Sequence, residues 1–444
     1  MKGSWKVPET KSLGRFSIGV GDRFAHQASS QLRACLLAAE AGVQVVPVWN
    51  KSNREHTIIG SEPAQTRAAA DAAVSALGWK QPYFCDADHI NLSTVDRFLE
   101  ACDFFTIDVA DQIGVAAGQA DLDRFVRSRT NLVGEIELPG LAEPILVKRE
   151  DLDRVGRKYL AAALQAAENY RYIERAKGKG TFLTEVSMDE TDVPQQPVDL
   201  LLILAALADA GVALATIAPK FTGRFNKGVD YVGDVSVFAR ELEQDMAVIE
   251  YAIRAFGLPA ELKLSLHSGS DKFSIYGAVH EAMMKRGTGL HVKTAGTTWL
   301  EEMIGLAESG GNALALVKEV YTEAYGHREE LCAPYAAVID IDVAALPGPA
   351  VAQGWTAEQW VGALRHEPGS LEYNRSLRQL MHVAFKIAAK MGARYIAMLE
   401  QHEECVAENV TRNLFDRHIG PIFLGANRAL GDVHSPASAA SVRH

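Results

Sequence analysis

Eight short apolar runs, each followed by a helical stretch, constrain this chain more than any other feature. The runs cover residues 16–20, 43–49, 83–85, 104–107, 182–186, 212–217, 262–266 and 290–292. Alanine- and leucine-rich segments with helical spacing lie between them, for example residues 31–41, 199–210 and 237–256. Strands that alternate with helices form parallel βαβ units. Eight such units predict an α/β fold, a (β/α)8 TIM-type barrel.

A doubly wound parallel sheet is the alternative architecture. Such a sheet binds its ligand at a switch point, with a glycine-rich loop around the phosphates. The segment Gly19-Val20-Gly21-Asp22 has a G-x-G arrangement but no third glycine at the expected place. We therefore favour the barrel, and because no dinucleotide fingerprint is visible we expect no nicotinamide cofactor.

The regions outside the eight units predict additions to the barrel. Residues 1–307 would form the catalytic barrel domain, with an insertion at about residues 114–180 that holds a hairpin and a helix after the fourth strand. Residues 308–434 have a mostly helical pattern, and we expect them to pack on the barrel as a C-terminal extension. The Ser- and Ala-rich residues 435–444 predict a disordered tail.

Composition and charge narrow the range of partners. The chain has 444 residues and a net charge of −11, which leaves no basic face to replace the counterions of a nucleic acid. Its longest apolar run, residues 200–208, is too short to cross a membrane, which takes about 20 residues. Five scattered cysteines without metal-finger spacing favour a reducing cytoplasm. We expect a cytoplasmic protein that acts on a small molecule, and the sequence leaves a homo-oligomer open.

Two histidines follow the apolar pattern of the last two strands. His267 and His291 each precede a polar, glycine-containing loop, and Glu185 lies on the fifth strand. Because the carboxyl ends of parallel strands meet at one mouth of a barrel, these three side chains could hold one divalent metal ion. Two imidazoles and a carboxylate suit Zn, Mn, Ni or Co. The alternative is that both histidines are buried and hydrogen-bonded to the backbone.

A denser polar cluster follows the third strand. It contains Asp86, Asp88 and His89. Asp88 could act as a general base or as a metal ligand, and His89 is a further candidate ligand or a partner of one. The alternative for either aspartate is to cap the segment that follows.

Cationic side chains near the predicted strand ends could bind an anionic or hydroxylated substrate. A lysine there could instead form a Schiff base, as in a class I aldolase. An arginine after one of the first two strands can clamp a carboxylate with two hydrogen bonds, although a surface ion pair is the alternative. The predicted substrate-binding residues are Asp22, Arg23, Arg54, Lys220, Asp271, Lys272 and Lys293.

The chain resembles the tagaturonate epimerase family of bacterial sugar-acid metabolism over most of its length. The matching segments include His267-Ser268-Gly269-Ser270-Asp271-Lys272-Phe273 and His291-Val292-Lys293-Thr294-Ala295-Gly296-Thr297. The other matching segments are residues 21–23, 86–89, 105–108, 185–191, 227–234 and 379–383. The resemblance implies a metal-dependent isomerase that inverts the carbon two places from the ketone of a ketohexuronate, of tagaturonate or fructuronate type.

That carbon is not acidified by the ketone, so a simple exchange of its proton would be slow. We expect a retro-aldol and aldol sequence, in which Asp88 or Glu185 takes the proton of the β-hydroxyl group and a metal ion stabilises the enediolate. Four alternatives stay open. They are transient oxidation by a bound nicotinamide, a class II-type aldolase or lyase acting on a sugar acid, a ketohexose 4-epimerase, and a sugar-binding protein without activity.

Overall fold

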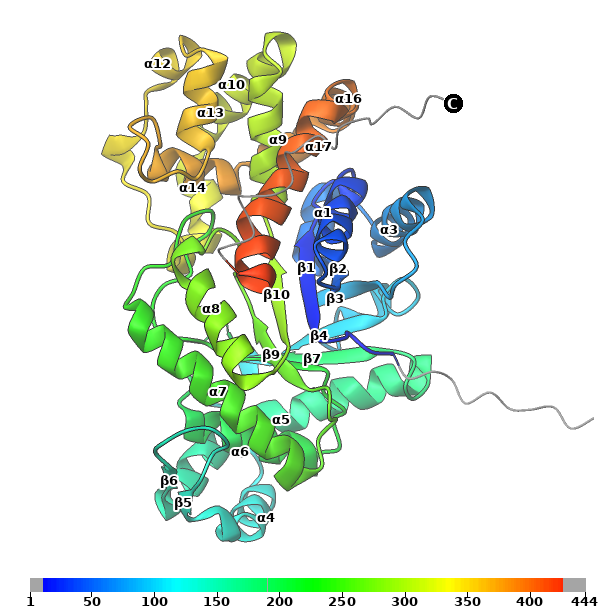
Figure 1. Cartoon of the computed structure of the whole chain (residues 1–444), viewed down its shortest axis with the longest axis vertical. Coiled ribbons are helices and arrows are strands. Elements are labelled where there is room, and N and C mark those ends of the chain that lie inside the picture. The colour runs from blue at the N-terminus through cyan, green and yellow to red at the C-terminus, as the bar shows by residue number, and fades with distance from the viewer. Residues whose placement is uncertain (1–10, 190, 426–444) are drawn as a thin grey trace, which may run out of the picture.

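The computed structural model describes residues 11–189 and 191–425, and it contains a closed barrel of eight parallel strands (Figure 1). Around the barrel the order is β1-β10-β9-β8-β7-β4-β3-β2. The predicted fold class is therefore confirmed. The strands are β1 (Phe16–Gly21), β2 (Val45–Ser52), β3 (Phe84–Ile90), β4 (Phe104–Asp108), β7 (Leu183–Ser187), β8 (Thr216–Ala218), β9 (Lys263–Leu266) and β10 (Leu290–Thr294). The predicted disordered tail, residues 435–444, lies outside the described residues.

Strand burial explains why the strands read as short apolar runs. All six residues of β1 are buried, because one face lines the barrel interior and the other is covered by helices. The last strand closes the barrel by pairing with the first, and Phe16 lies opposite Leu290 in that register. Every pair in the barrel is parallel, so the carboxyl ends of all eight strands lie at one mouth.

Helices cover the outside of the barrel. They are α1 (Ala28–Glu40), α2 (Asn53–Ile59), α3 (Pro63–Leu77), α5 (Arg149–Lys177), α6 (Pro197–Asp209), α7 (Val235–Phe256) and α8 (Phe273–Arg286). The insertion after β4 contains the predicted antiparallel hairpin of β5 (Gly134–Ile136) and β6 (Ile145–Val147), and α5 is the predicted helix that follows it. Helix α4 (Gln119–Ser128), before the hairpin, was not predicted. Among the described residues, no helix is long and apolar enough to cross a membrane.

The C-terminal region is helical and has a hydrophobic cluster of its own. It contains α9 (Thr297–Glu308), α10 (Gly311–Gly326), α11 (Arg328–Cys332), α12 (Pro349–Gln353), α13 (Ala357–Leu364), α14 (Arg375–Val383), α15 (Phe385–Met391), α16 (Ala393–Gln401) and α17 (Glu403–Leu414). Although α9 follows the last barrel strand directly, its buried Trp299, Leu300 and Met303 belong to this second cluster. The domain boundary at residue 307 stays a prediction.

The end of the described chain returns to the barrel. Helix α17 continues into the π-helix η6 (Phe415–Leu424), and together they pass between α8 and α1 on the outside of the barrel (Figure 1). The ring of Phe423 lies 5.2 Å from that of Phe16 on β1, and Thr411 donates a hydrogen bond to the carbonyl oxygen of Ser30. Helix α9 follows β10 but packs into the C-terminal cluster. The position on the outside of the barrel beside β10 is therefore occupied by η6, the last described helix.

Replacing Phe423 with alanine should destabilise the whole barrel. The side chain is fully buried in the barrel core cluster, and a buried Phe→Ala change typically costs about 3–5 kcal/mol. We expect a loss of that size in the free energy of unfolding measured by urea titration. Leu371→Ala, at a fully exposed position, is the control and should change it by less than about 0.5 kcal/mol. A loss under 1 kcal/mol for Phe423→Ala would mean that η6 is not part of the barrel wall.

Candidate active site

A lysine at the mouth of the barrel is surrounded by three carboxylates. The Lys293 ammonium nitrogen lies 2.7 Å from Asp86 Oδ2, 2.8 Å from Asp88 Oδ1 and 3.0 Å from Glu185 Oε1. These four residues, which we call the carboxylate–lysine network, come from β10, β3 and β7. Thr106 on β4 bridges them, because its hydroxyl group accepts from Lys293 and donates to Asp86.

Burial and charge set the protonation of the carboxylate–lysine network. Burial opposes the Lys293 ammonium, but the three carboxylates outweigh it and raise its pKa well above the usual value. Burial raises the pKa of Asp86 to about 6, with Lys293 acting against it. For Asp88 the attraction of Lys293 and His89 overcomes burial and lowers the pKa to about 2. The network therefore holds one lysine cation and ionised carboxylates in a nearly dry site.

His267 links this network to a further carboxylate. Its Nε2 lies 2.6 Å from Glu185 Oε1 and its Nδ1 lies 3.2 Å from Asp189 Oδ1. Burial lowers the pKa of His267, but Asp189 and Glu185 together raise it to about 9. Thr216 donates a 2.6 Å hydrogen bond to the other oxygen of Glu185. Glu185 is thus fully used in orienting neighbours.

An irregularity in β3 brings His89 to the same place. The pairing with β4 shifts between Ala87 and Ile90, and His89 has a positive φ of 50°. A β-bulge of this kind turns a side chain away from the regular in-and-out alternation, often beside an active site. The ring centroid of His89 lies 5.5 Å from that of His267, and Asp108 holds Nδ1 of His89 at 3.2 Å.

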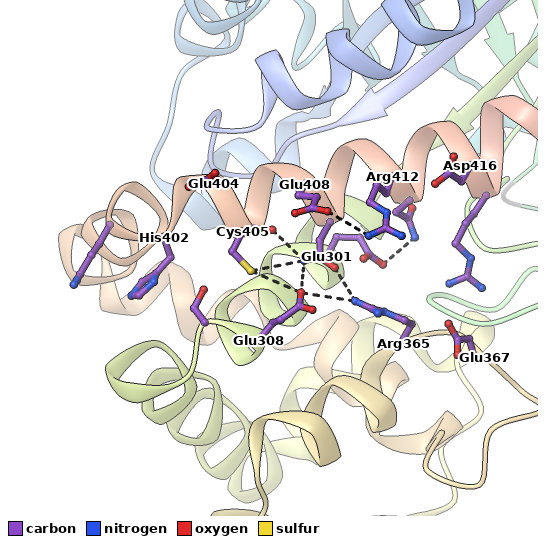
Figure 2. Close-up of a pocket in the computed structure, with 15 residues that line it drawn as sticks. Glu301, Glu308, Arg365, Glu367, His402, Glu404, Cys405, Glu408, Arg412 and Asp416 are labelled. Carbon is purple, nitrogen blue, oxygen red and sulfur yellow. Dashed lines mark hydrogen bonds and ion pairs between the residues drawn. The ribbon is translucent and has the colours of Figure 1, made fainter. Parts of the chain in front are cut away.

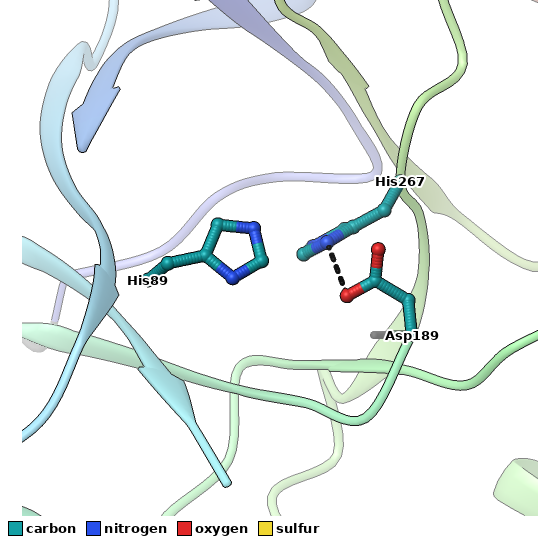
Figure 3. A group of neighbouring side chains, drawn as sticks. All are labelled: His89, Asp189 and His267. Carbon is teal, nitrogen blue, oxygen red and sulfur yellow. Dashed lines mark ion pairs between the residues drawn. The ribbon is translucent and has the colours of Figure 1, made fainter. Parts of the chain in front are cut away.

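His89, Asp189 and His267, which we call the His–Asp–His group, fit a divalent metal ion. One ligand atom from each lies within 4.8 Å of the other two, and Figure 3 shows the three side chains facing one another. Two imidazoles and one carboxylate form a donor set that suits Zn, Mn, Ni or Co and leaves coordination positions for substrate. Asp108 and Glu185 would act as the partners that fix the two imidazole rings.

Comparison with known proteins identifies the family of this chain. A family model described as tagaturonate epimerase matches residues 3–419. This chain belongs to the tagaturonate epimerase family. A tagaturonate/fructuronate epimerase of Thermotoga maritima is 28% identical over 421 residues, which cover 91% of this chain and 80% of that protein. The chain is thus an enzyme of the isomerase class, an epimerase.

Solved structures resemble this epimerase over most of its length. The fructuronate-tagaturonate epimerase of Cohnella laeviribosi with one bound glycerol superposes with a TM-score of 0.76 at 25% identity, covering 94% of this chain and 83% of that one. The native crystal structure of the same enzyme gives a TM-score of 0.75 at 24% identity. The barrel and its helical extension are therefore shared.

His291 does not join the His–Asp–His group, contrary to the expectation from the sequence. It lies opposite Ser17 on β1 and Ser265 on β9, two residues before Lys293 on the same strand, and so one layer deeper in the barrel. Its Nδ1 pairs with the Ser17 hydroxyl group at 2.9 Å. Burial lowers its pKa to about 3, so the imidazole is neutral. The small serines make room for the ring, and its Nε2 has no hydrogen-bond partner among the described residues.

The other predicted substrate-binding residues are scattered. Arg54 is exposed and lies over the ring of Tyr335. The Lys220 ammonium group donates to the carbonyl oxygen of Thr191 and so pins the loop after β7. Asp22 accepts from the backbone nitrogen of Gln27 at the start of α1. None of these three contacts the carboxylate–lysine network.

Asp271 and Lys272 tie the barrel to its extension. Asp271 has a φ of 61° and lies 3.0 Å from a guanidinium nitrogen of Arg378 on α14. The Lys272 ammonium group donates to the carbonyl oxygens of Asn226, Val229 and Ser270 at 2.7–2.9 Å. Both side chains are buried, and Oδ2 of Asp271 has no hydrogen-bond partner among the described residues. These contacts join the barrel to the extension, and substrate binding by either residue stays a prediction.

Sequence reasoning gave no role to Asp189, Asp108 or Thr106. A signal was present for the first two, since both aspartates stand at or just after the end of a predicted strand, where the mouth of a barrel forms. Thr106 has no such signal, because an inward-facing threonine is common in strands. Its role depends on register, which places it beside Glu185.

A well-formed cavity lies elsewhere, in the helical extension. It has a volume of about 540 Å³ and is lined by polar side chains of α9, α17 and neighbouring segments, among them Glu301, Glu308 and Arg365 (Figure 2). Its charged groups pair with one another, as Arg365 does with Glu308 at 3.9 Å. None of its lining residues belongs to the network or to the His–Asp–His group. We therefore locate the active site from the strand ends.

Proposed function

We propose that this epimerase interconverts tagaturonate and fructuronate, inverting the carbinol carbon β to the ketone with the help of a divalent metal ion. The observation that carries the proposal is the position of the carboxylate–lysine network beside the His–Asp–His group, with His267 contacting both. One set provides proton acceptors and the other provides metal ligands. A proton acceptor and a Lewis acid together can break and remake a carbon–carbon bond next to a ketone.

The reaction proceeds by retro-aldol cleavage. A carboxylate takes the proton of the β-hydroxyl group, whose O–H electrons form the new carbonyl bond of an aldehyde. The α–β carbon bond breaks, and its electron pair moves into the enediolate made from the ketone. The aldehyde group rotates so that its other face points toward the enediolate. The carbon–carbon bond then forms again on that face, and the proton returns to the aldehyde oxygen. No atom or electron is gained or lost.

Asp88 is the carboxylate that we assign to this proton transfer. Its side chain is 10% exposed, whereas those of Asp86 and Glu185 are 0% exposed. Asp88 is therefore the carboxylate of the network nearest to the open mouth of the barrel, and Asp86 and Glu185 lie deeper. Lys293 holds the Asp88 oxygen in position, and the pKa of Asp86, near 6, lets that neighbour share the proton.

The His–Asp–His group, with Glu185 beside it, would hold the metal ion. A bound divalent cation supplies a Lewis acid that stabilises negative charge developing on the ketone oxygen. Glu185 and Asp108 orient the two imidazoles, and Lys293 lowers the cost of placing three carboxylates near the same substrate. Zn, Mn, Ni and Co all suit this donor set.

Removing metal should abolish the activity. Chelator-treated protein is expected to epimerise tagaturonate at least about 100-fold more slowly than untreated protein, and Zn, Mn, Ni or Co should restore the rate. Elemental analysis gives the metal content, and an NMR time course with tagaturonate gives the rate. Full activity in metal-free protein would contradict the proposal.

The same time course separates the alternatives. A free three-carbon aldehyde that accumulates during turnover would identify an aldolase, whereas an epimerase retains it. Dependence of the rate on a bound nicotinamide would identify transient oxidation. A higher rate on tagatose than on tagaturonate would identify a ketohexose 4-epimerase.

A further inference from the structure

A histidine of the helical extension lies against the loops at the barrel mouth. His382 is on α14, is 3% exposed, and neither of its ring nitrogens hydrogen-bonds to any residue that the structure describes. A buried polar group without a partner typically costs about 1–3 kcal/mol. A position that only needed packing would be filled more favourably by leucine, so the imidazole points to a ligand.

Three barrel loops converge on this imidazole, and two glycines make the approach possible. Gly296, after β10, has a φ of 93°, and a Cβ atom there would overlap Nε2 of His382 and lie 3.0 Å from Nη2 of Arg23. A Cβ atom on Gly228, in the loop after β8, would lie 3.3 Å from the same ring. The His382 ring and the Arg23 guanidinium group thus both border Gly296.

The charges around His382 leave a net positive site. Arg23 lies 3.3 Å from Glu55, and Arg378 lies 3.0 Å from Asp271, so these two cations are already paired. Lys227 contacts only the hydroxyl group of Ser268, at 3.3 Å, and forms no ion pair with a described residue. Burial, followed by the charges of Arg23 and Lys227, lowers the pKa of His382 well below its usual value. The ring is therefore a neutral donor beside a cation without a counterion.

Lys227 also joins this site to the His–Asp–His group. Ser268, its hydroxyl partner, is the residue directly after His267 and has a φ of 51°. The backbone nitrogen of Lys227 donates to Val338 of the extension at 2.8 Å, which holds the loop in place. A molecule that contacts Lys227 at one end can therefore approach the His267 region with the other.

We propose that His382, Arg23 and Lys227 bind the carboxylate of the sugar acid, and that this site makes the enzyme select acids over neutral ketoses. The inference rests on the proposed function, because it assumes a substrate with a ketone at one end and a carboxylate at the other. A carboxylate can accept a hydrogen bond from the His382 ring and act as the counterion of Lys227. It can also accept a hydrogen bond from the guanidinium nitrogens of Arg23 that do not face Glu55. The carboxylate also stays on the aldehyde fragment after cleavage, so holding it keeps that fragment in the site.

The test compares a charged and a neutral probe on His382→Leu, which keeps the volume and removes the donor. In the unaltered enzyme D-glycerate should inhibit more strongly than glycerol, which lacks the carboxylate. We expect the variant to bind glycerate about 10- to 100-fold more weakly, with glycerol unchanged and with KM for tagaturonate raised more than kcat is lowered. His382→Gln, which keeps a donor, should recover part of the loss. His327→Asn, at an exposed position of the extension, is the control.

The inhibition assay can contradict the inference in two ways. An unchanged glycerate-to-glycerol ratio in His382→Leu, or an equal loss for both probes, would overturn the inference. Thermal unfolding checks the fold of the variant, which should be at least as stable as the parent because an unpaired polar group is removed. Normal probe binding without turnover of tagaturonate by the parent enzyme would instead refute the proposed function and leave the anion site standing.

Discussion

Lys293→Met is expected to unfold or nearly unfold the protein at neutral pH and to abolish its activity. The change leaves Asp86, Asp88 and Glu185 in a buried site without their shared cation. Breaking a buried ion pair by removing one partner typically costs about 3–5 kcal/mol, against a total stability of about 5–15 kcal/mol. Urea unfolding and an epimerase assay measure the two effects.

The pH dependence of this loss has a definite sign. In the parent protein the folded pKa values of Asp88 and Glu185 lie below their unfolded values. Their contribution to stability is therefore present above pH about 4 and is lost as the pH falls through the lower folded values. In Lys293→Met the lysine no longer opposes burial and only neighbouring histidines do, so the folded pKa values of the carboxylates rise and the variant should be most stable when they are protonated. Its deficit should grow from pH 4 to pH 8.

Lys263→Met is the matched control. Lys263 is also a buried barrel lysine, but it donates to the carbonyl oxygens of Gly14 and Arg15 and has no carboxylate cluster. Burial lowers its pKa to about 7, so the charge is already costly. We expect a smaller loss of stability and retained activity. If both variants behaved alike, the carboxylate–lysine network would have no special role.

The second large effect is a contrast between two histidines. His267→Asn should lose bound metal and lower kcat at least about 100-fold, because it removes a member of the His–Asp–His group. His291→Asn should keep both the metal and most of kcat, because His291 contacts Ser17 one layer deeper. Metal content per chain and the initial rate measure the contrast. Equal loss of metal in both variants would favour the metal site expected from the sequence, Glu185, His267 and His291.

The contrast also shows what a sequence can and cannot predict about this site. Alternation of apolar runs and helices was enough for the barrel, and the polar residues after each run identified the mouth. The depth of a side chain depends on where its strand ends. β9 ends at Leu266, so His267 is in the loop, whereas β10 runs from Leu290 to Thr294, so His291 is still inside the strand. An apolar pattern cannot separate these two cases.

Other features of the site depend on tertiary structure alone. The bulge that turns His89 toward His267 is a shift in pairing between two strands, which no single-strand pattern contains. His382 is more than a hundred residues from Lys227, and only the folding of the extension over the mouth brings them near. Asp271 and Lys272 were predicted to bind substrate because they follow a strand, yet a left-handed backbone at Asp271 accompanies their turn into the extension.

The return of the last described helix to the first strand sets an order for synthesis on the ribosome. β1 and α1 emerge first, but η6, which covers them, is translated some four hundred residues later. Until then Phe16 and the apolar face of α1 lack the partner that shields them from water. The nascent chain therefore exposes apolar surface of β1 and α1 through most of its translation. Chaperones bind such surfaces, and chains that expose them aggregate at high expression. Production of this enzyme should respond to translation rate and to chaperone supply more than its final stability would indicate.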